Sequence, residues 1–303
     1  MVHFLSLRDF SAKELEGLIR RAMEVKRYPQ SVQDAMRGKT LALLFLKHST
    51  RTRVSFEVAM YQMGGNAIYL TADTSQFGRG ETIADTIRTL SRYVDAVAAR
   101  VFEHEQLEEL ARHATVPVIN ALTNFNHPCQ VLGDLMTILE HKGRLDGIRL
   151  SFLGPADNNI VNSLLHACPK FGVHLTVCSP PGQRLNPTAL EYARAVARET
   201  DTEVRLVHDP IEAVKNADVI YTDVWFSMHE TPSEEGLRLY RPYQVNEALM
   251  AQAPKDAVFM HCMPIKRGQE ATDAVADSEQ SIIFDQAENR LHTQKAILLH
   301  LIG

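Results

Sequence analysis

Hydrophobic and polar positions follow two patterns that alternate through most of this chain. Short continuous apolar runs, such as residues 41–46, are typical of strands buried on both faces of a sheet. Between these runs, apolar residues recur at every third or fourth position, as Leu15, Leu18 and Ala22 do. This spacing predicts helices with one buried face. The alternation of strands and helices predicts an α/β fold with mostly parallel, doubly wound sheets.

The individual elements follow from where each pattern begins and ends. Apolar runs predict strands over residues 41–46, 66–70, 95–99, 116–122, 148–153, 173–178, 203–207, 218–222 and 257–260. Helical spacing predicts helices after the capping-box pattern at Ser11–Glu14, after residues 49–53, near 83–90 and 105–113, from 128 to about 143, from the turn at 154–159 to about 171, and over 187–199, 245–251 and 285–303. Gly64-Gly65 is expected to end the second helix. The elements form two groups, which predicts two domains, residues 1–142 and 143–285, with a boundary near Gly143.

The polar turn Ser49-Thr50-Arg51-Thr52-Arg53 lies between the apolar run 41–46 and the helix that follows it. Free backbone N–H groups and the positive end of the helix dipole meet at such a turn, which favours an anion. Arg51 or Arg53 adds a fork of donors that matches phosphate oxygens. The alternative is a helix capped by Ser49 or Thr50 with two solvated arginines. Five phosphate-compatible residues in a row favour a phosphate site.

Other polar clusters also follow predicted strands. In open α/β sheets, ligands bind at the carboxyl ends of the strands, so this coincidence predicts a shared site. Each cluster alone has a structural explanation: a solvated strand end, a helix start with proline in its first turn, plain capping, or a buried thiol. The clusters are Arg100, residues 127–130, residues 157–159, residues 223–228 and residues 261–264.

Composition and charge narrow the function classes. A net charge of −5 argues against a general nucleic-acid surface, so any anion site must be a local group of arginines. The four cysteines form no C-x-x-C pair, and no signal peptide precedes them, so we expect reduced thiols in the cytosol. No apolar run approaches the roughly 20 residues of a membrane span. The chain has no H-E-x-x-H or cysteine-pair metal pattern, and we expect no metal and no organic cofactor.

Four motifs together resemble the carbamoyltransferases. Residues 49–53 resemble the carbamoyl-phosphate motif of that family, and His127-Pro128-Cys129-Gln130 resembles its H-P-x-Q motif. Residues 223–228, Asp-Val-Trp-Phe-Ser-Met, resemble the D-x-W-x-S-M segment of the ornithine branch, and His261-Cys262-Met263-Pro264 resembles its H-C-L-P motif. Gln76 also fits this branch, because the aspartate branch usually has lysine in that loop. Four residues depart from the family pattern: Leu46, Asn124, His229 and Met263.

The resemblance implies transfer of the carbamoyl group of carbamoyl phosphate to the δ-amino group of L-ornithine, giving L-citrulline and phosphate. It implies a first domain that binds carbamoyl phosphate, a second that binds ornithine, and an active site in the cleft between them. It also implies that the last helix, residues 286–303, returns to the first domain. A homotrimer, or a multiple of trimers, with shared sites is implied as well, because in this family the loop around Gln76 reaches a neighbour's site.

The resemblance also assigns roles to individual residues. Arg100 would bridge phosphate and carbonyl oxygen, His127 and Arg290 would polarise the carbonyl, and Cys262 would orient or deprotonate the δ-amine. The carbamoyl NH2 would be held by Gln130 and by the main-chain carbonyls of Cys262 and Met263. The phosphate would be bound by Ser49, Thr50, Arg51, Thr52 and Gln76, and the α-amino and α-carboxylate groups of ornithine by Asn159, Asp223, Ser227 and Met228.

Three other readings remain open to test. A carbamoyltransferase could act on another amine, such as N-acylornithine, putrescine or aspartate; Asp223 favours a free α-amino group, because an acylated one needs no carboxylate. A dinucleotide-binding dehydrogenase would show G-x-G-x-x-G after an early strand, and Gly154-Pro155-Ala156 does not match it. A non-catalytic binding paralogue would not be expected to keep four motif residues together: Arg51, His127, Gln130 and Cys262.

Overall fold

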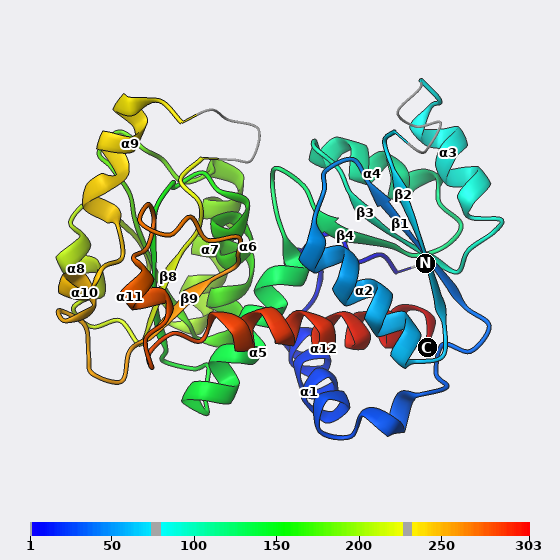
Figure 1. Cartoon of the computed structure of the whole chain (residues 1–303), viewed down its shortest axis with the longest axis horizontal. Helices are drawn as coiled ribbons and strands as arrows, with labels where there is room; N and C mark the ends of the chain where they lie inside the picture. Colours follow the sequence, from blue (N-terminus) through cyan, green and yellow to red (C-terminus); the bar gives the residue numbers. More distant parts are fainter. Residues whose placement is uncertain (1, 74–79, 227–231) are drawn as a thin grey trace. The chain divides into compact units, whose positions relative to one another are not determined.

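The computed structural model describes residues 2–73, 80–226 and 232–303 (Figure 1). Its contacts divide the chain into two compact units, Met1–Met136 with Glu288–Gly303, and Thr137–Ala287. Each unit contains one parallel sheet with helices around it, so the predicted fold class is confirmed. The unit bounds fall inside the helices α5 (Pro128–Lys142) and α12 (Ile283–Ile302), whereas we predicted boundaries at 142/143 and 285/286.

The first unit is built on a four-stranded sheet in the order β2-β1-β3-β4. All residues of β1 after Thr40 are buried, as the apolar run predicts, because helices cover both faces of this central strand. On one face Ala42 and Leu44 pack with Val97 and Ala99 of β3. The strands are β1 (Thr40–Phe45), β2 (Asn66–Thr71), β3 (Ala96–Arg100) and β4 (Val118–Leu122), and the helices are α1 (Ala12–Arg27), α2 (Thr50–Gln62), α3 (Ile83–Leu90) and α4 (His104–His113).

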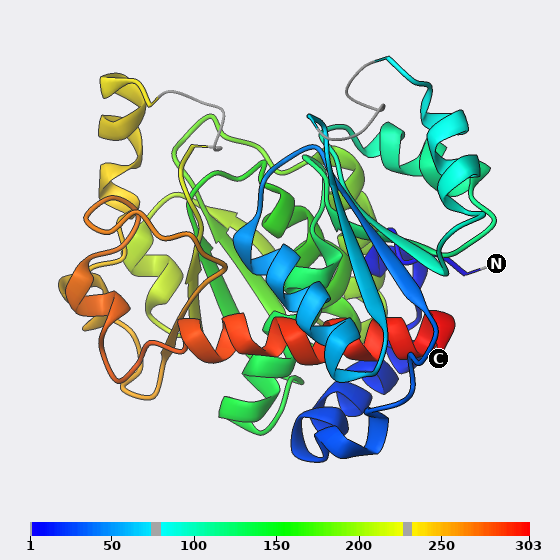
Figure 2. The ribbon, with the colours of Figure 1, turned by 45° about the vertical axis from the view of Figure 1, so that its right-hand side comes forward.

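Capping residues mark the start of α1 and the end of α2 where the sequence predicts them. Ser11 and Glu14 form the expected capping box at the start of α1. Gly64, just after α2, has φ +80°, and a Cβ there would lie 2.8 Å from the carbonyl oxygen of Gln33, so only glycine fits. Within the first unit α12 runs beside α1 (Figures 1 and 2), where Lys26 Nζ donates to Asn289 Oδ1 at 2.9 Å.

The second unit is built on a five-stranded sheet in the order β7-β6-β5-β8-β9. One face carries an apolar core that Leu153, Ile220 and Phe259 share with residues of α8, α10 and α11. The strands are β5 (Arg149–Leu153), β6 (His174–Cys178), β7 (Val204–Val207), β8 (Val219–Thr222) and β9 (Val258–His261), and the helices are α6 (Asn159–Ala167), α7 (Pro187–Thr200), α8 (Pro210–Val214), α9 (Glu234–Tyr240), α10 (Glu247–Met250) and α11 (Asp273–Ala276). The sequence pattern did not predict α8, α9 or α11.

The strand order places one switch point in each sheet. In the first unit the chain leaves β1 for β2 on one side and continues with β3 on the other, so the switch point lies between β1 and β3. In the second unit it lies between β5 and β8. Connections run away from a switch point in both directions, which leaves a crevice at the carboxyl ends of the two strands. Each unit therefore presents a binding position of its own.

Two further observations concern the expected absence of a membrane span and the state of the cysteines. Among the residues that the structure describes, no helix combines the length and apolar character needed to cross a membrane. All four cysteines are free thiols, three of them buried and Cys262 half-buried.

Candidate active site

The polar turn after β1 begins a helix, as predicted. Ser49 is the N-cap of α2, and its hydroxyl accepts from the backbone N–H of Thr52 at 3.3 Å. Thr50 is exposed, Ser49 and Arg51 are half-buried, and Thr52 is buried. The first backbone N–H groups of α2 thus point out of the helix at the switch point of the first sheet. This geometry suits an anion without any side chain, and the hydroxyls add to it.

The two arginines of the turn point to different partners. Arg53 is exposed, its Nε donates to Glu57 Oε1 at 2.9 Å, and its guanidinium lies 4.0 Å from the ring centroid of Tyr69. Arg51 instead lies close enough to His127 to lower the pKa of that imidazole. Of the two alternatives, the structure therefore favours Arg51 as the arginine of the site.

Arg290 of α12 connects three parts of the first unit. Its Nη1 donates to Gln130 Oε1 at 2.5 Å and its Nη2 donates to Thr52 Oγ1 at 3.1 Å. Gln130 Nε2 in turn donates to Asp134 Oδ1 at 2.8 Å. All four side chains are buried. The helices α2, α5 and α12 are thereby joined by polar contacts directly at the anion turn.

His127 lies among three guanidinium groups. Burial, followed by the charges of Arg290, Arg100 and Arg51, holds its pKa well below the usual 6.5, so the imidazole is neutral at physiological pH. Arg100 is the last residue of β3 and is buried. Neighbouring cations in a buried place repel one another, and an anion bound among them relieves that repulsion. A neutral imidazole beside them can still donate a hydrogen bond.

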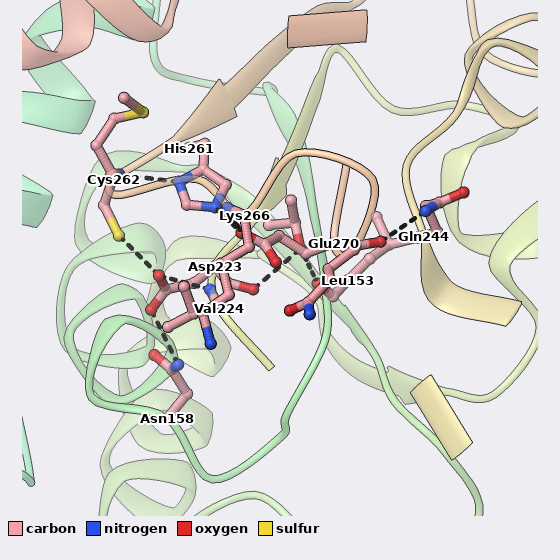
Figure 3. A network of polar contacts seen from close by, with 12 residues as sticks. Leu153, Asn158, Asp223, Val224, Gln244, His261, Cys262, Lys266 and Glu270 are labelled. Carbon is pink, nitrogen blue, oxygen red and sulfur yellow. Dashed lines mark hydrogen bonds and ion pairs between the residues drawn. The ribbon is translucent and has the colours of Figure 1, made fainter. Parts of the chain in front are cut away.

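Asp223 is the centre of a polar network in the second unit (Figure 3). It follows β8 and is 7% exposed. Its Oδ1 accepts from the backbone N–H of Val224 at 2.8 Å and from Cys262 Sγ at 3.1 Å, and its Oδ2 accepts from Asn158 Nδ2 at 3.1 Å. Because these donors come from the ends of β5, β8 and β9, the carboxylate is fixed at the switch point of the second sheet.

The loop after β9 is fixed by a second buried pair. Met263 N–H donates to His261 Nδ1 at 2.8 Å, so the ring proton is on Nε2, which lies 3.2 Å from Glu270 Oε1. Neither His261 nor Glu270 is exposed. Met263 has φ 60°, a conformation that costs energy for a residue with a side chain. The contact to His261 holds this conformation and so fixes the main chain between Cys262 and Met263.

Asp223, His261 and Cys262 also carry metal-ligating atoms within 4.8 Å of one another, the only such group in the described ranges. Their hydrogen bonds account for these atoms. Both ring nitrogens of His261 are engaged, and Asp223 accepts from three donors. We therefore read the group as a hydrogen-bonded network that orients the thiol.

The predicted site residues thus fall into two described sets, one in each unit. The first unit contains eight described residues predicted for the carbamoyl-phosphate side: Ser49, Thr50, Arg51, Thr52, Arg100, His127, Gln130 and Arg290. Asp223, Cys262 and Met263 lie together in the second unit; Asn159, the first residue of α6, is half-buried and directly follows Asn158. Gln76, Ser227, Met228 and His229 lie outside the described residues.

Two family models match the chain. The carbamoyl-P binding domain of aspartate/ornithine carbamoyltransferase matches residues 2–140, and the Asp/Orn binding domain matches residues 146–301. The chain belongs to the aspartate/ornithine carbamoyltransferase family. The resemblance inferred from the four motifs is therefore confirmed.

Individual members of the family are similar over their full length. The ornithine carbamoyltransferase of Thermococcus kodakarensis is 49% identical over 302 residues, which cover 99% of this chain and 96% of the relative. A relative from Pyrococcus furiosus named "Ornithine carbamoyltransferase, anabolic" is 49% identical over 302 residues, with coverage of 99% and 96%. The solved structure of the Pyrococcus furiosus ornithine carbamoyltransferase superposes with a TM-score of 0.95, 49% identity, and coverage of 99% and 97%. These names agree with the ornithine branch that residues 223–228 and 261–264 indicate.

Sequence reasoning missed three residues that orient the family's motif residues. Asp134, Asn158 and Glu270 each accept or donate hydrogen bonds to a predicted site residue or its neighbour. Asp134 had a detectable signal: it is the one acid in the mostly apolar stretch 131–139, four residues after Gln130, and a buried carboxylate at that spacing needs a partner. For Asn158 the sequence predicts only a helix cap. It does cap α6, since its Oδ1 accepts from Ile160 N–H at 2.7 Å, but its amide also holds Asp223.

The lowered pKa of His127 predicts a pH-dependent stability. An unfolded chain binds a proton at this histidine below about pH 6.5, whereas the folded state does not, so the free energy of unfolding falls as pH drops below that value. We expect His127→Gln to lose less stability than the wild type between about pH 8 and pH 5.5. Urea unfolding at both pH values measures this. The other histidines are the same in both proteins. Equal losses of unfolding free energy would therefore mean that folding does not lower the pKa of His127.

Cys262 is expected to act on the amine through its contact with Asp223. Cys262 Sγ donates to Asp223 Oδ1 at 3.1 Å, and serine keeps a donor there, but a hydroxyl ionises far less readily than a thiol and so supplies no thiolate that can accept a proton from the amine. We expect lower kcat/KM for ornithine and a changed dependence of kcat/KM on pH, with no change in KM for carbamoyl phosphate. An unchanged pH profile would show that Cys262 only packs.

Proposed function

We propose that this chain transfers the carbamoyl group of carbamoyl phosphate to the δ-amino group of L-ornithine, giving L-citrulline and phosphate. The observation that carries the proposal is the group of three guanidiniums around a neutral, buried His127 at the switch point of the first sheet. The names of the full-length relatives support the same reaction. The Asp223–Cys262 contact in the second unit supplies a carboxylate for an amino-acid substrate.

The first unit would hold carbamoyl phosphate. Phosphate oxygens would accept from the N–H groups at the start of α2, from the hydroxyls of Ser49, Thr50 and Thr52, and from Arg51. Gln76 is proposed to join them. Arg100 would contact both phosphate and the carbonyl oxygen, and His127 and Arg290 would donate to that oxygen as charge develops on it. Donors fixed in advance at such a position stabilise the transition state more than the ground state.

The second unit would hold ornithine. Asp223 would pair with the α-amino group, with Asn159, Ser227 and the Met228 backbone completing the amino-acid contacts. The carbonyls of Cys262 and Met263 would accept from the carbamoyl NH2, and Cys262 would orient the δ-amine. The neutral amine attacks the carbonyl carbon, the carbon–oxygen bond to phosphate then breaks, and the nitrogen loses a proton as phosphate leaves with the bonding electrons.

An amine screen with carbamoyl phosphate tests the proposal. Ornithine, N-acetylornithine, putrescine and aspartate are each supplied, and phosphate release and the ureido product are both scored. We expect ornithine to give equal amounts of phosphate and citrulline, and the other amines far less. If the enzyme prefers N-acetylornithine, putrescine or aspartate, that amine is the substrate and ornithine is not. Phosphate release without any ureido product would contradict carbamoyl transfer altogether.

We further propose that the chain works in the synthesis of citrulline in the cytosol, as a homotrimer or a multiple of trimers. The anabolic name of the Pyrococcus furiosus relative supports the direction, and four free thiols suit a reducing compartment. Exposed apolar side chains in the first unit, Val54, Tyr61 and Ile68 on α2 and β2, suit burial against another copy.

Shared sites in a trimer would be seen by complementation. Arg51→Ala and Gln76→Ala should each be inactive alone, because each removes a phosphate contact from every site. If Gln76 acts in a neighbour's site, dissociating and remixing the two variants should restore activity, since some interfaces then join an intact Gln76 to an intact Arg51. Mass measurement confirms mixed trimers. Background activity in such trimers would refute sharing, and a monomer by light scattering would refute the trimer.

A further inference from the structure

The side-chain amide of Gln130 is held from both ends inside the first unit. Its Oε1 accepts from Arg290 Nη1 at 2.5 Å, and its Nε2 donates to Asp134 Oδ1 at 2.8 Å. Gln130 is 1% exposed, Asp134 is fully buried, and Arg290 is 4% exposed. Gln130 and Asp134 are one turn apart on α5, while Arg290 comes from α12.

The chemistry of the two partners allows only one orientation of this amide. A guanidinium has donors and no acceptor, and a carboxylate has acceptors and no donor. A glutamine turned by 180° would place its NH2 against Arg290 and its oxygen against Asp134, and both contacts would fail. In a buried place each failed contact leaves an unsatisfied polar group, which costs far more than at the surface. The oxygen end therefore keeps a fixed direction, with a second lone pair free of Arg290.

We infer that Asp134 is a positioning residue that sets the polarity of Gln130 so that Oε1 accepts from the NH2 of the carbamoyl group. The inference rests on the proposed function and adds a basis for selectivity. A carbamoyl group differs from an acetyl group in having NH2 where acetyl has CH3. A fixed acceptor pairs with the first and is left unpaired by the second, so the site discriminates against acetyl phosphate and similar acyl phosphates.

A matched pair of stable ligands measures this selectivity without turnover. Phosphonoacetamide and acetonylphosphonate differ only in NH2 versus CH3, and inorganic phosphate reports the anion contacts alone. Calorimetry on the wild type should show preference for the amide ligand. Asp134→Leu removes the acceptor of Gln130 Nε2, so we expect the preference to fall roughly tenfold, about the effect of one hydrogen bond, with unchanged phosphate affinity. Asp134→Asn keeps an acceptor oxygen and should recover most of the preference.

A double-mutant cycle separates positioning from packing. Gln130→Leu should abolish the preference, and Asp134→Leu in that background should then cause no further loss. Thr137→Val, a buried change of similar volume one turn further along α5, serves as the packing control and should keep the wild-type preference. An unchanged preference in folded Asp134→Leu, or a further loss in the Gln130→Leu background, would overturn the inference. The proposed function fails by a separate measurement: the wild type would then form no citrulline from carbamoyl phosphate and ornithine.

Discussion

Arg290→Met is expected to lower kcat for citrulline formation by about a thousandfold, the upper range for loss of one transition-state donor. Arg290 is 4% exposed, and it donates to both Gln130 and Thr52. Methionine keeps the length of the aliphatic stem but has no donor. Three losses then coincide: a donor to the carbonyl oxygen, a positive charge at the phosphate, and the contact that directs Gln130. Steady-state rates at saturating substrates measure the effect.

Arg53→Met is the matched control for this substitution. Arg53 lies on α2 at the same anion turn, but it is exposed and pairs with Glu57 and Tyr69. Exposed ion pairs contribute little to stability, so this variant should keep wild-type activity and folding. If folded Arg290→Met keeps more than about a tenth of the wild-type kcat, Arg290 serves packing, because a lost oxyanion donor costs more than that.

The difference between Arg51 and Arg53 shows where prediction from sequence ends. The strand, the cap and the helix at this turn were predicted because each depends on residues close together in the chain. Which arginine faces the site depends on how α2 is rotated against its sheet, because two positions along a helix differ by about 200° around its axis. Arg53 contacts Glu57 and Tyr69 instead of the site, and the apolar pattern of the sequence cannot predict those contacts.

The missed elements and residues have similar physical causes. The helices α8, α9 and α11 have only four to seven residues, too few for a helical period to repeat, so packing rather than a local pattern decides them. Asn158 and Asp223 are far apart in the sequence and meet because β5 and β8 are neighbours in the sheet. Strand order is a long-range property, so the residues at each switch point were predictable as strand ends but not as partners.

Asp223→Asn is expected to lower kcat/KM for ornithine by about a hundredfold, the scale of a lost charge-assisted hydrogen bond with its partner left unpaired. Asparagine has one acceptor oxygen where the carboxylate has two. If that oxygen stays with Val224 and Cys262, the new NH2 faces the NH2 of Asn158. Asn158 cannot turn to meet it without withdrawing the oxygen that caps α6 at Ile160. The negative charge for an ammonium group is lost in either case.

The pattern of kinetic constants identifies the role of Asp223. KM for carbamoyl phosphate should not change, because its proposed ligand residues lie mostly in the first unit, whereas KM for ornithine should rise. The preference for ornithine over N-acetylornithine should shrink, because only the free α-amino group needs a carboxylate. Asp209→Asn is the control, since Asp209 caps α8 through Ile211 N–H and asparagine caps equally well. Equal losses for both amines would show that Asp223 maintains the loop rather than binding the α-amino group.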